Sequence, residues 1–216
     1  KSDSSSTTTS SVSFVSVGYS GTILTSPDGT TWTSRTSGTT HRLWGVTYGN
    51  STFVAVGNSG TILTSSDGTS WTSRTSGTTN TLFRVTYGNG TFVTVGNTGT
   101  ILTSSDSTSW DNRTSGTSNQ LLGVTYGNST FVTVSYSGTI HTSTDGTTWD
   151  NRTSGTSNIL VGVTYGNGTF VTVGQSGTIL TSSDGITWDN RTSGTSSILI
   201  GVTYGNNTFV SVGFSG

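Results

Sequence analysis

Residues 43–56 read LWGVTYGNSTFVAV, and close variants of this stretch return four more times along the chain. Two apolar runs flank a Gly-Asn turn, which is the pattern of a β-hairpin. The Tyr-Gly-Asn element recurs at a constant step of 39 residues, with its tyrosine at Tyr48, Tyr87, Tyr126, Tyr165 and Tyr204. The chain is therefore organised as a 39-residue repeat.

Each repeat divides into four short segments that are typical of β-strands. In the copy beginning at Leu43, a loop at 57–60 leads to a third strand at 61–64, and a turn at 65–70 leads to Trp71 and a polar fourth strand. The first three strands carry apolar residues on both faces, as expected for small sheets buried between neighbouring sheets. The fourth is rich in Thr, Ser, Asp, Asn and Arg, so we expect it on the outside.

Four-stranded antiparallel units of about 40 residues, arranged around an axis, form a β-propeller. The sequence predicts an all-β, five-bladed propeller built from 39-residue four-stranded repeats, without helices. We expect a single propeller domain over residues 11–216, after a polar lead-in at residues 1–10.

The composition argues against several classes of protein. Only 8% of the 216 residues are charged, the net charge is −1, and all nine acidic residues are Asp, which disfavours nucleic-acid binding through a basic surface. No apolar run approaches the roughly 18 residues that cross a bilayer, so no membrane span is expected. The absence of cysteine excludes disulfides and thiolate metal sites.

The turn before each repeated tryptophan resembles a known family motif. Residues 26–32, SPDGTTW, are similar to the Asp-box of bacterial neuraminidase-type repeats. The resemblance implies a turn between the third and fourth strands of a blade, whose Ser and Asp bond turn amides while the Trp packs under the hairpin. Ser107 stands where the third copy should have Gly, so that turn is expected to be strained or rebuilt. The motif residues are Ser26, Asp28 and Trp32; Ser65, Asp67 and Trp71; Ser104, Asp106 and Trp110; Ser143, Asp145 and Trp149; and Ser182, Asp184 and Trp188.

This placement of the turn fixes the strand order in a blade. The Leu-x-Gly-Val-Thr-Tyr strand becomes innermost, and five inner, five third and five fourth strands accompany six second strands. We expect residues 199–204 to close the ring by pairing with residues 22–37. One terminal second strand then completes that blade and the other stays unpaired. The repeat-matched second strands are 14–17, 53–56, 92–95, 131–134, 170–173 and 209–212.

The sequence offers no catalytic constellation. A sialidase would need clustered arginines, a Tyr–Glu pair and an acid, but the chain has no Glu and its repeated arginines fall on the outermost strand. His41 and His141 are interpreted as surface or loop residues. We predict a non-enzyme without cofactor or metal, because near-identical repeats place the same groups at five equivalent points, whereas an active site needs unlike groups at one.

A carbohydrate-binding propeller with sites between the blades is one alternative. Its candidate positions vary while their surroundings stay constant, although a duplicated lectin should repeat its contacts and these do not. We interpret a third variable set, Trp44, Phe83, Leu122, Val161 and Ile200, as core filling. The possible ligand loop comprises Tyr19, Asn58, Asn97, Tyr136 and Gln175, and the loop before the inner strand supplies Arg42, Thr81, Gln120, Ile159 and Ile198.

The favoured interpretation is a structural or adhesive protein at the cell surface or outside the cell. Its partners would be copies of itself, joined into filaments or arrays by terminal strand exchange, or surface glycans. A turn Asn followed by a strand Thr forms a glycosylation sequon by chance, so occupancy stays open. A longer parent chain is also an expectation. The sequons begin at Asn50, Asn89, Asn112, Asn128, Asn151, Asn167, Asn190 and Asn206.

Overall fold

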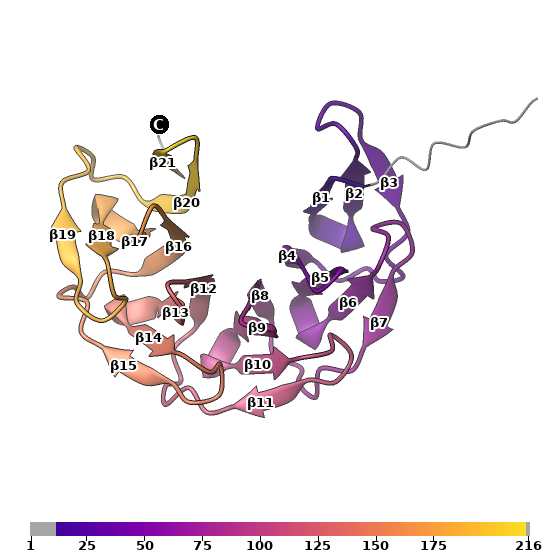
Figure 1. Ribbon diagram of the computed structural model, residues 1–216, viewed down its shortest axis with the longest axis horizontal. Coiled ribbons are helices and arrows are strands. Elements are labelled where there is room, and N and C mark those ends of the chain that lie inside the picture. The colour runs from indigo at the N-terminus through magenta and orange to yellow at the C-terminus, as the bar shows by residue number, and fades with distance from the viewer. Residues whose placement is uncertain (1–11, 215–216) are drawn as a thin grey trace, which may run out of the picture.

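The computed structural model describes residues 12–214, which form six small antiparallel sheets arranged as an open arc (Figure 1). The lead-in expected at residues 1–10 lies outside the described residues. The inner strands line the hollow of the arc and the fourth strands form its rim. This arrangement confirms an all-β, propeller fold of four-stranded repeats.

Four of the sheets are complete, and each runs from an inner to an outer strand. Their strands are β4 (Leu43–Gly49), β5 (Thr52–Gly57), β6 (Ile62–Ser65) and β7 (Thr72–Arg74); β8 (Leu82–Gly88), β9 (Thr91–Gly96), β10 (Ile101–Ser104) and β11 (Asp111–Arg113); β12 (Leu121–Gly127), β13 (Thr130–Ser135), β14 (Ile140–Ser143) and β15 (Asp150–Arg152); and β16 (Leu160–Gly166), β17 (Thr169–Gly174), β18 (Ile179–Ser182) and β19 (Asp189–Arg191).

The two end sheets are partial. The first contains β1 (Phe14–Val17), β2 (Ile23–Ser26) and β3 (Thr33–Arg35), and the last contains β20 (Leu199–Gly205) and β21 (Thr208–Gly213). The described strands thus comprise five inner, six second, five third and five fourth strands, as the repeat predicts. Single 3₁₀ turns join the second and third strands, and no α-helix occurs in residues 12–214: η1 (Tyr19–Gly21), η2 (Asn58–Gly60), η3 (Asn97–Gly99), η4 (Tyr136–Gly138) and η5 (Gln175–Gly177).

The expected ring closure is wrong in this structure. Strand β20 pairs with β21 and does not pair with β2 or β3, and the two end sheets lie apart across the mouth of the arc (Figure 1). Each end sheet has its own second strand. Strand β1 pairs with β2 in the first sheet, and β21 pairs with β20 in the last. The edge that closure would require is therefore already occupied at both ends.

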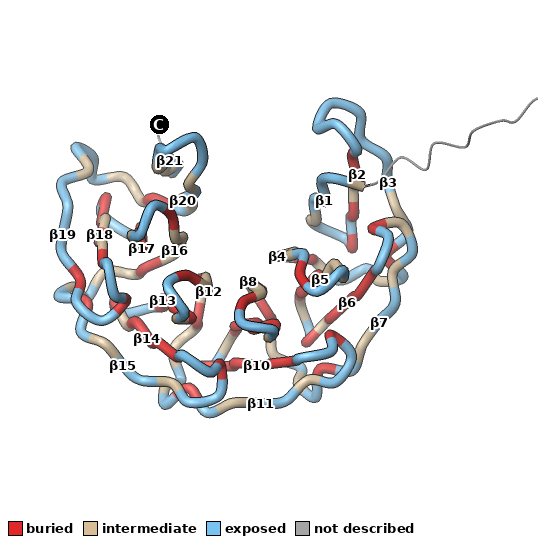
Figure 2. The backbone as a smooth tube through the Cα atoms, viewed as in Figure 1, coloured by how far each residue is buried: buried red, intermediate tan, exposed pale blue. Residues whose placement is uncertain are grey.

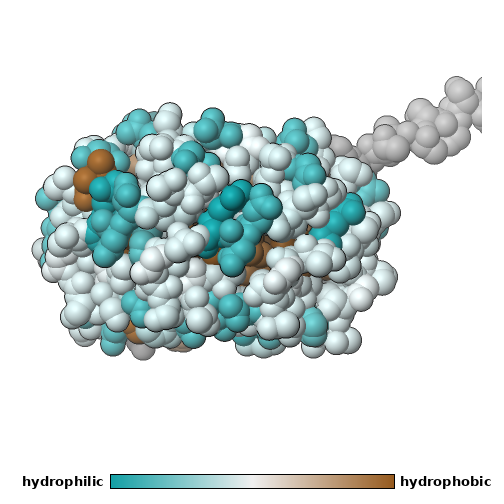
Figure 3. All heavy atoms as spheres, turned by 90° about the horizontal axis from the view of Figure 1, so that it is seen from below, coloured by the Kyte–Doolittle hydropathy of each residue, from teal (hydrophilic) through white to brown (hydrophobic). Residues whose placement is uncertain are grey.

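Burial follows the position of a strand within the sheet and of the sheet within the arc (Figure 2). Second strand β13 is almost wholly buried, whereas the equivalent β21 alternates between exposed and half-buried residues. The fourth strands are mostly exposed, as expected. Figure 3 shows that the rim they form is largely near-neutral in hydropathy with scattered hydrophilic residues, which agrees with its Thr and Ser content.

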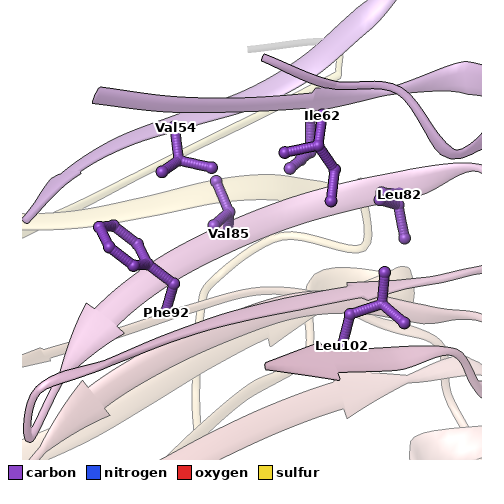
Figure 4. Close-up of a cluster of buried hydrophobic side chains, with 7 residues drawn as sticks. Val54, Ile62, Leu82, Val85, Phe92 and Leu102 are labelled. Atoms are coloured by element: carbon purple, nitrogen blue, oxygen red, sulfur yellow. The ribbon is translucent and has the colours of Figure 1, made fainter. Parts of the chain in front are cut away.

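The core lies between consecutive sheets (Figure 4). In one such layer Val54 and Ile62 face Leu82, Phe92 and Leu102 of the following sheet, and all five side chains are buried. The same layer is repeated around the arc. Apolar residues on both faces of the four complete sheets are thereby explained, because each of these sheets is covered by the sheet before it and the sheet after it.

Glycine allows the inner strands to approach one another. A β-carbon at Gly127 would collide with the ring and β-carbon of Tyr165 from the next inner strand, and the same holds for Gly49, Gly88 and Gly166 with their tyrosines. At Gly205 no atom lies within 4 Å of that position. The Gly in Tyr-Gly-Asn therefore serves the contact between sheets as well as the turn.

His141 corrects a prediction. It lies on β14, where the other third strands have Leu, and only 2% of it is exposed, so it is neither a surface nor a loop residue. Its Nδ1 is buried and has no hydrogen-bond partner among residues 12–214. Burial lowers the pKa of this imidazole from its ordinary value, because a buried cation would lose its hydration.

Candidate functional site

The turns that resemble Asp-boxes have the hydrogen bonds that the resemblance implies. In the second copy Asp67 Oδ1 accepts from the amides of Thr69 and Ser70, and Ser65 Oγ accepts from the amide of Gly68, each at 2.8 Å. Trp71 donates through Nε1 to the carbonyl of Gly68 at 3.1 Å. These carboxylates are engaged within their own turns, so the turns are structural.

The third copy is strained, and it lacks the bond that the Gly amide donates to the motif Ser Oγ in the other four copies. Ser107 keeps a φ of 64°, close to the 73–80° of the glycines at the same position in the other copies. Asp106 Oδ1 still accepts two turn amides at 2.8 Å. The Ser107 hydroxyl bonds the Asp106 carbonyl at 2.5 Å.

The asparagines of all eight sequons are exposed. Five occupy the hairpin turns between inner and second strands with a φ of 44–47°, and three lie on the fourth strands. Every acceptor is therefore accessible, while its occupancy stays a prediction.

The two variable loops meet within each sheet. Asn58 N donates to the Arg42 carbonyl at 2.9 Å, and the same bond recurs in the next four sheets. The five proposed loop residues nevertheless do not converge. Asn97, Tyr136 and Gln175 lie on the 3₁₀ turns of successive sheets, each one repeat further along the arc.

A bulge in each inner strand overturns the core interpretation of Trp44 and its equivalents. The pairing of β4 with β5 shifts between Leu43 and Gly45, so Trp44 is the extra residue. An extra residue leaves the ladder and turns its side chain away from the regular alternation. The side chains in this set are half-buried or exposed, and Ile200 is 40% exposed.

These features combine at one end of the arc into a group that we call the aromatic–arginine cluster: Tyr19, Arg42, Trp44, Phe83 and Arg84. The Arg42 guanidinium carbon lies 3.8 Å from the centroid of the Tyr19 ring and 3.2 Å from that of Trp44. Arg42 Nη1 donates to the Tyr19 hydroxyl at 2.6 Å. The cation is thus held against two rings.

The remaining contacts fix the two rings and join two sheets. Trp44 donates through Nε1 to Asn58 Oδ1 at 2.7 Å, and its ring meets Phe83 edge-on with centroids 5.6 Å apart. Arg84 Nη1 donates at 2.9 Å to the carbonyls of both Trp44 and Phe83. The candidate ligand positions named from the sequence included Tyr19, Arg42 and Asn58, but not Arg84. The sequence did contain a sign of Arg84, because the other four inner strands have Gly at this position.

The charge around this cluster is unbalanced. Residues 12–100 contain four arginines and two aspartates, whereas residues 101–214 contain three arginines and six aspartates. Within residues 12–214 the ion pairs join Arg113, Arg152 and Arg191 to an Asp two positions earlier. Arg42 and Arg84 have no acidic partner in that range.

The surroundings of Arg84 lower the pKa of its guanidinium. Partial desolvation, with the nearby charge of Arg42 as a second cause, lowers its pKa from the ordinary value. A guanidinium nevertheless stays protonated at neutral pH. The cluster therefore presents two cations and three aromatic rings.

Four hollows recur between successive sheets and are called here inter-blade pockets. Each lies against the 3₁₀ turn, the fourth strand and the loop that leaves the sheet, and in three of the four the loop that enters the sheet also lines it. From the N-terminal end their volumes are about 850, 530, 450 and 560 Å³. Hydroxyl, amide and glycine residues and one repeated arginine line them, together with a leucine in three of the four and His41 in the first.

Two absences hold for the described part of the chain. Residues 12–214 bring no three His, Cys, Asp or Glu side chains together as a metal site would require. They also contain no helix with the length and apolar character needed to cross a membrane.

The fold and the cluster together define a β-propeller arc with an aromatic and cationic surface site. The sequence matches no protein-family model and no curated protein. Among solved structures the chain is similar to YCF48 bound to D1 peptide, with a TM-score of 0.73 and 22% identity over 94% of this chain and 72% of that one.

Two further structures show the same fold. The WD40 β-propeller domain of Doa1 has a TM-score of 0.69 and 17% identity, covering 91% of this chain and 70% of that one. The computationally designed Ika8 protein has a TM-score of 0.66 and 12% identity, covering 94% and 68%. The arc thus spans about 70% of the length of each of these three chains.

Proposed function

We propose that the protein is a non-catalytic interaction propeller whose aromatic–arginine cluster binds a peptide segment rich in acidic side chains. The convergence of Tyr19, Arg42, Trp44, Phe83 and Arg84 carries the proposal. In a chain of near-identical repeats, this is where unlike groups gather at one point, as a specific binding site requires.

The chemistry of the cluster favours an anionic peptide over a neutral one. Arg42 and Arg84 lack an acidic partner within the described residues, and arginine binds carboxylates through paired donors. Aromatic and arginine side chains are also the residues that dominate protein interfaces. The structure of YCF48 with a bound D1 peptide adds support by analogy of fold.

The test replaces the cluster arginines by residues that other repeats carry. Arg42→Thr with Arg84→Gly should weaken binding of a fluorescent peptide of alternating Glu and Leu at least tenfold in an anisotropy titration. The control is Gln120→Thr. Gln120 occupies the position of Arg42 two repeats further along the chain and lies outside the cluster, so this change should leave binding unchanged. Failure of the wild-type chain to bind the peptide, or equal binding by the double variant, would exclude this function.

Self-association is a second candidate, favoured by the exposed apolar residues of the end sheets. Val210 and Val212 on β21 are 51% and 59% exposed, whereas the equivalent Val132 and Val134 are fully buried. Unpaired apolar edges add to other sheets. Light scattering should detect polymers of the full chain that vanish when residues 1–18 are removed, and a monomer at high concentration would exclude the idea.

Two finer assignments belong to the same proposal. We assign the turns to the Asp-box type on their hydrogen bonds, and the protein to the extracellular space on its hydroxyl-rich, sequon-bearing surface. Intact mass of native material tests glycosylation. Carbohydrate binding in the inter-blade pockets remains the alternative for the repeated sites, and a glycan array tests it.

A further inference from the structure

The four inter-blade pockets share one hydrogen-bonded frame. In each sheet from the second onward the arginine of the fourth strand donates through Nε to a threonine of the third strand at 2.8 Å. A threonine at the pocket wall donates its hydroxyl to the carbonyl that begins the 3₁₀ turn. The pockets are thus four copies of one site, and differences between them can be identified residue by residue.

The first pocket differs at the residue that holds the entering loop. Asn80, Asn119 and Asn158 donate through Nδ2 to Thr100, Thr139 and Thr178 in the other pockets. His41 occupies this position in the first pocket, with Nδ1 2.8 Å from Thr61 Oγ1.

The hydrogen bonds fix which tautomer His41 adopts. The Thr61 hydroxyl donates to the Asn58 carbonyl at 2.7 Å, so Nδ1 of His41 is the donor of their shared bond. Nε2 therefore carries no proton in the neutral ring, and it has no partner within residues 12–214.

The second difference concerns the repeated arginine. In the other three pockets its Nη2 forms an ion pair of 2.9–3.0 Å with the Asp two residues earlier. Thr72 stands at that position before Arg74, so Arg74 has no carboxylate partner in residues 12–214. No acidic residue lines any of the four pockets, so the Asp partners of the sibling arginines lie beside the pockets and not in their linings.

We propose that the first inter-blade pocket binds a peptide carboxylate, with the guanidinium of Arg74 as its principal partner. The three sibling pockets show the geometry, because there a carboxylate of the chain itself already sits on the equivalent arginine. Beside the first pocket Thr72 takes the place of that Asp, so no carboxylate of the chain sits on Arg74, and the pocket volume is the largest of the four, about 850 Å³. His41 and the hydroxyls of the wall add polar partners beside the guanidinium.

The inference rests on the proposed function in one respect, since the carboxylate belongs to the same peptide. His41 precedes Arg42 directly in the chain, so the pocket adjoins the aromatic–arginine cluster. A segment lying across the cluster can therefore place an acidic side chain, or its C-terminal carboxylate, on Arg74.

The experiment separates the pocket from the cluster. The full chain, labelled with ¹⁵N, is titrated at pH 7 with three small probes: N-acetylglutamate methylamide, N-acetylglycine and N-acetylglutamine methylamide. The first carries a side-chain carboxylate, the second a terminal one and the third none. We expect saturable shifts of the Arg74 Nε–H and His41 ring signals with one or both acids and none with the amide, and the two acids tell which source fits.

Matched variants use the repeat itself. Thr72→Asp recreates the ion pair of the sibling pockets and should abolish the shifts, whereas Thr72→Asn keeps the size without the charge and should retain them. In the gain-of-site variant, Asn80→His with Asp111→Thr should make Arg113 respond to the same probes.

The peptide of alternating Glu and Leu provides the second readout. Thr72→Asp should weaken its binding about tenfold relative to Thr72→Asn, while loss of Arg42 and Arg84 should leave the small-probe shifts intact. Absence of shifts at Arg74, equal shifts with the amide, or shifts that survive Thr72→Asp would each overturn the proposal, whether or not the peptide binds to the cluster.

Discussion

Tyr204 lies directly against the α-carbon of Gly166, so a β-carbon at position 166 would fall inside the tyrosine side chain. The contact joins the inner strands of two consecutive sheets. It is repeated three times earlier in the arc and has no counterpart at Gly205.

The first prediction concerns this contact. Gly127→Ala should reduce the free energy of unfolding by up to about 3 kcal/mol, because the added methyl meets the Cβ and Cγ of Tyr165 and cannot be relieved by a rotamer change alone. Gly205→Ala, with open space at the same position, should change it by less than about 0.5 kcal/mol. Urea unfolding of both variants checks the difference, and equal effects would refute it.

The tryptophans under the turns should contribute unequally. Trp188 is 9% exposed and packs on Phe170 with ring centroids 6.4 Å apart, whereas Trp32 is 43% exposed. Trp188→Ala should cost about 3–5 kcal/mol, as for other buried aromatics, and Trp32→Ala markedly less. Thermal midpoints of the two variants measure the contrast. A larger loss at Trp32 would contradict the packing described here.

Ser107 offers a stabilising change. A left-handed conformation costs a residue with a side chain about 1 kcal/mol relative to glycine, so Ser107→Gly should stabilise the protein by about that amount. The reverse change in a sibling turn, Gly146→Ser, should destabilise it to a similar extent. Denaturant midpoints decide the matter, and no gain from Ser107→Gly would mean that its hydroxyl bond to Asp106 offsets the strain.

His141 offers a second stabilising change. Leu24, Leu63, Leu102 and Leu180 occupy its position in the other sheets. His141→Leu removes a buried nitrogen without a partner and should raise the free energy of unfolding by about 1–2 kcal/mol at pH 7. An unchanged or lowered denaturant midpoint would show that the imidazole is satisfied in solution.

The same residue makes stability depend on pH. Burial lowers the pKa of His141 in the folded protein, so below the unfolded value of about 6.5 the unfolded chain binds the proton more readily. Stability present above pH 6.5 is therefore lost as the pH falls below it. Between pH 7 and 5 the wild-type thermal midpoint should fall further than that of His141→Leu, which retains His41. Parallel curves would exclude His141 as the source.

The repeat made much of the fold predictable. The number and order of strands follow from the 39-residue spacing of Tyr48 and its equivalents. Each hairpin turn and each Trp occurs at the same position of the repeat and so marks where one strand ends and the next begins. The turn hydrogen bonds of Asp67 followed from the family resemblance. Closure was not predictable, since both Phe14 and Phe209 begin a strand that can fill the same place, and the sequence does not say which edge is occupied first.

The candidate site was only partly predictable. It arises from residues that occur once among the repeats: Arg84 in place of Gly, Trp44 at the bulge position and His41 in place of Asn. Such single changes are interpreted as drift when only the repeat pattern is considered. The bulge at Trp44 moves a side chain from the core side to the surface, which strand alternation cannot reveal. The prediction that His141 is a surface or loop residue was wrong for a related reason. It relied on the polarity of histidine, whereas the Leu at the same position of the other third strands indicates a buried site.

The sheets of the arc contact only their neighbours, so the energy needed to open any one of them depends on how many neighbours cover it. Strands β9 and β13 are covered on both faces, while β21 ends in exposed residues. Amide hydrogen exchange should accordingly be slowest in the middle of the chain and accelerate toward both ends. The aromatic–arginine cluster and the first inter-blade pocket lie in the first three sheets, near one of the fast-opening ends, where a bound peptide would slow exchange most visibly.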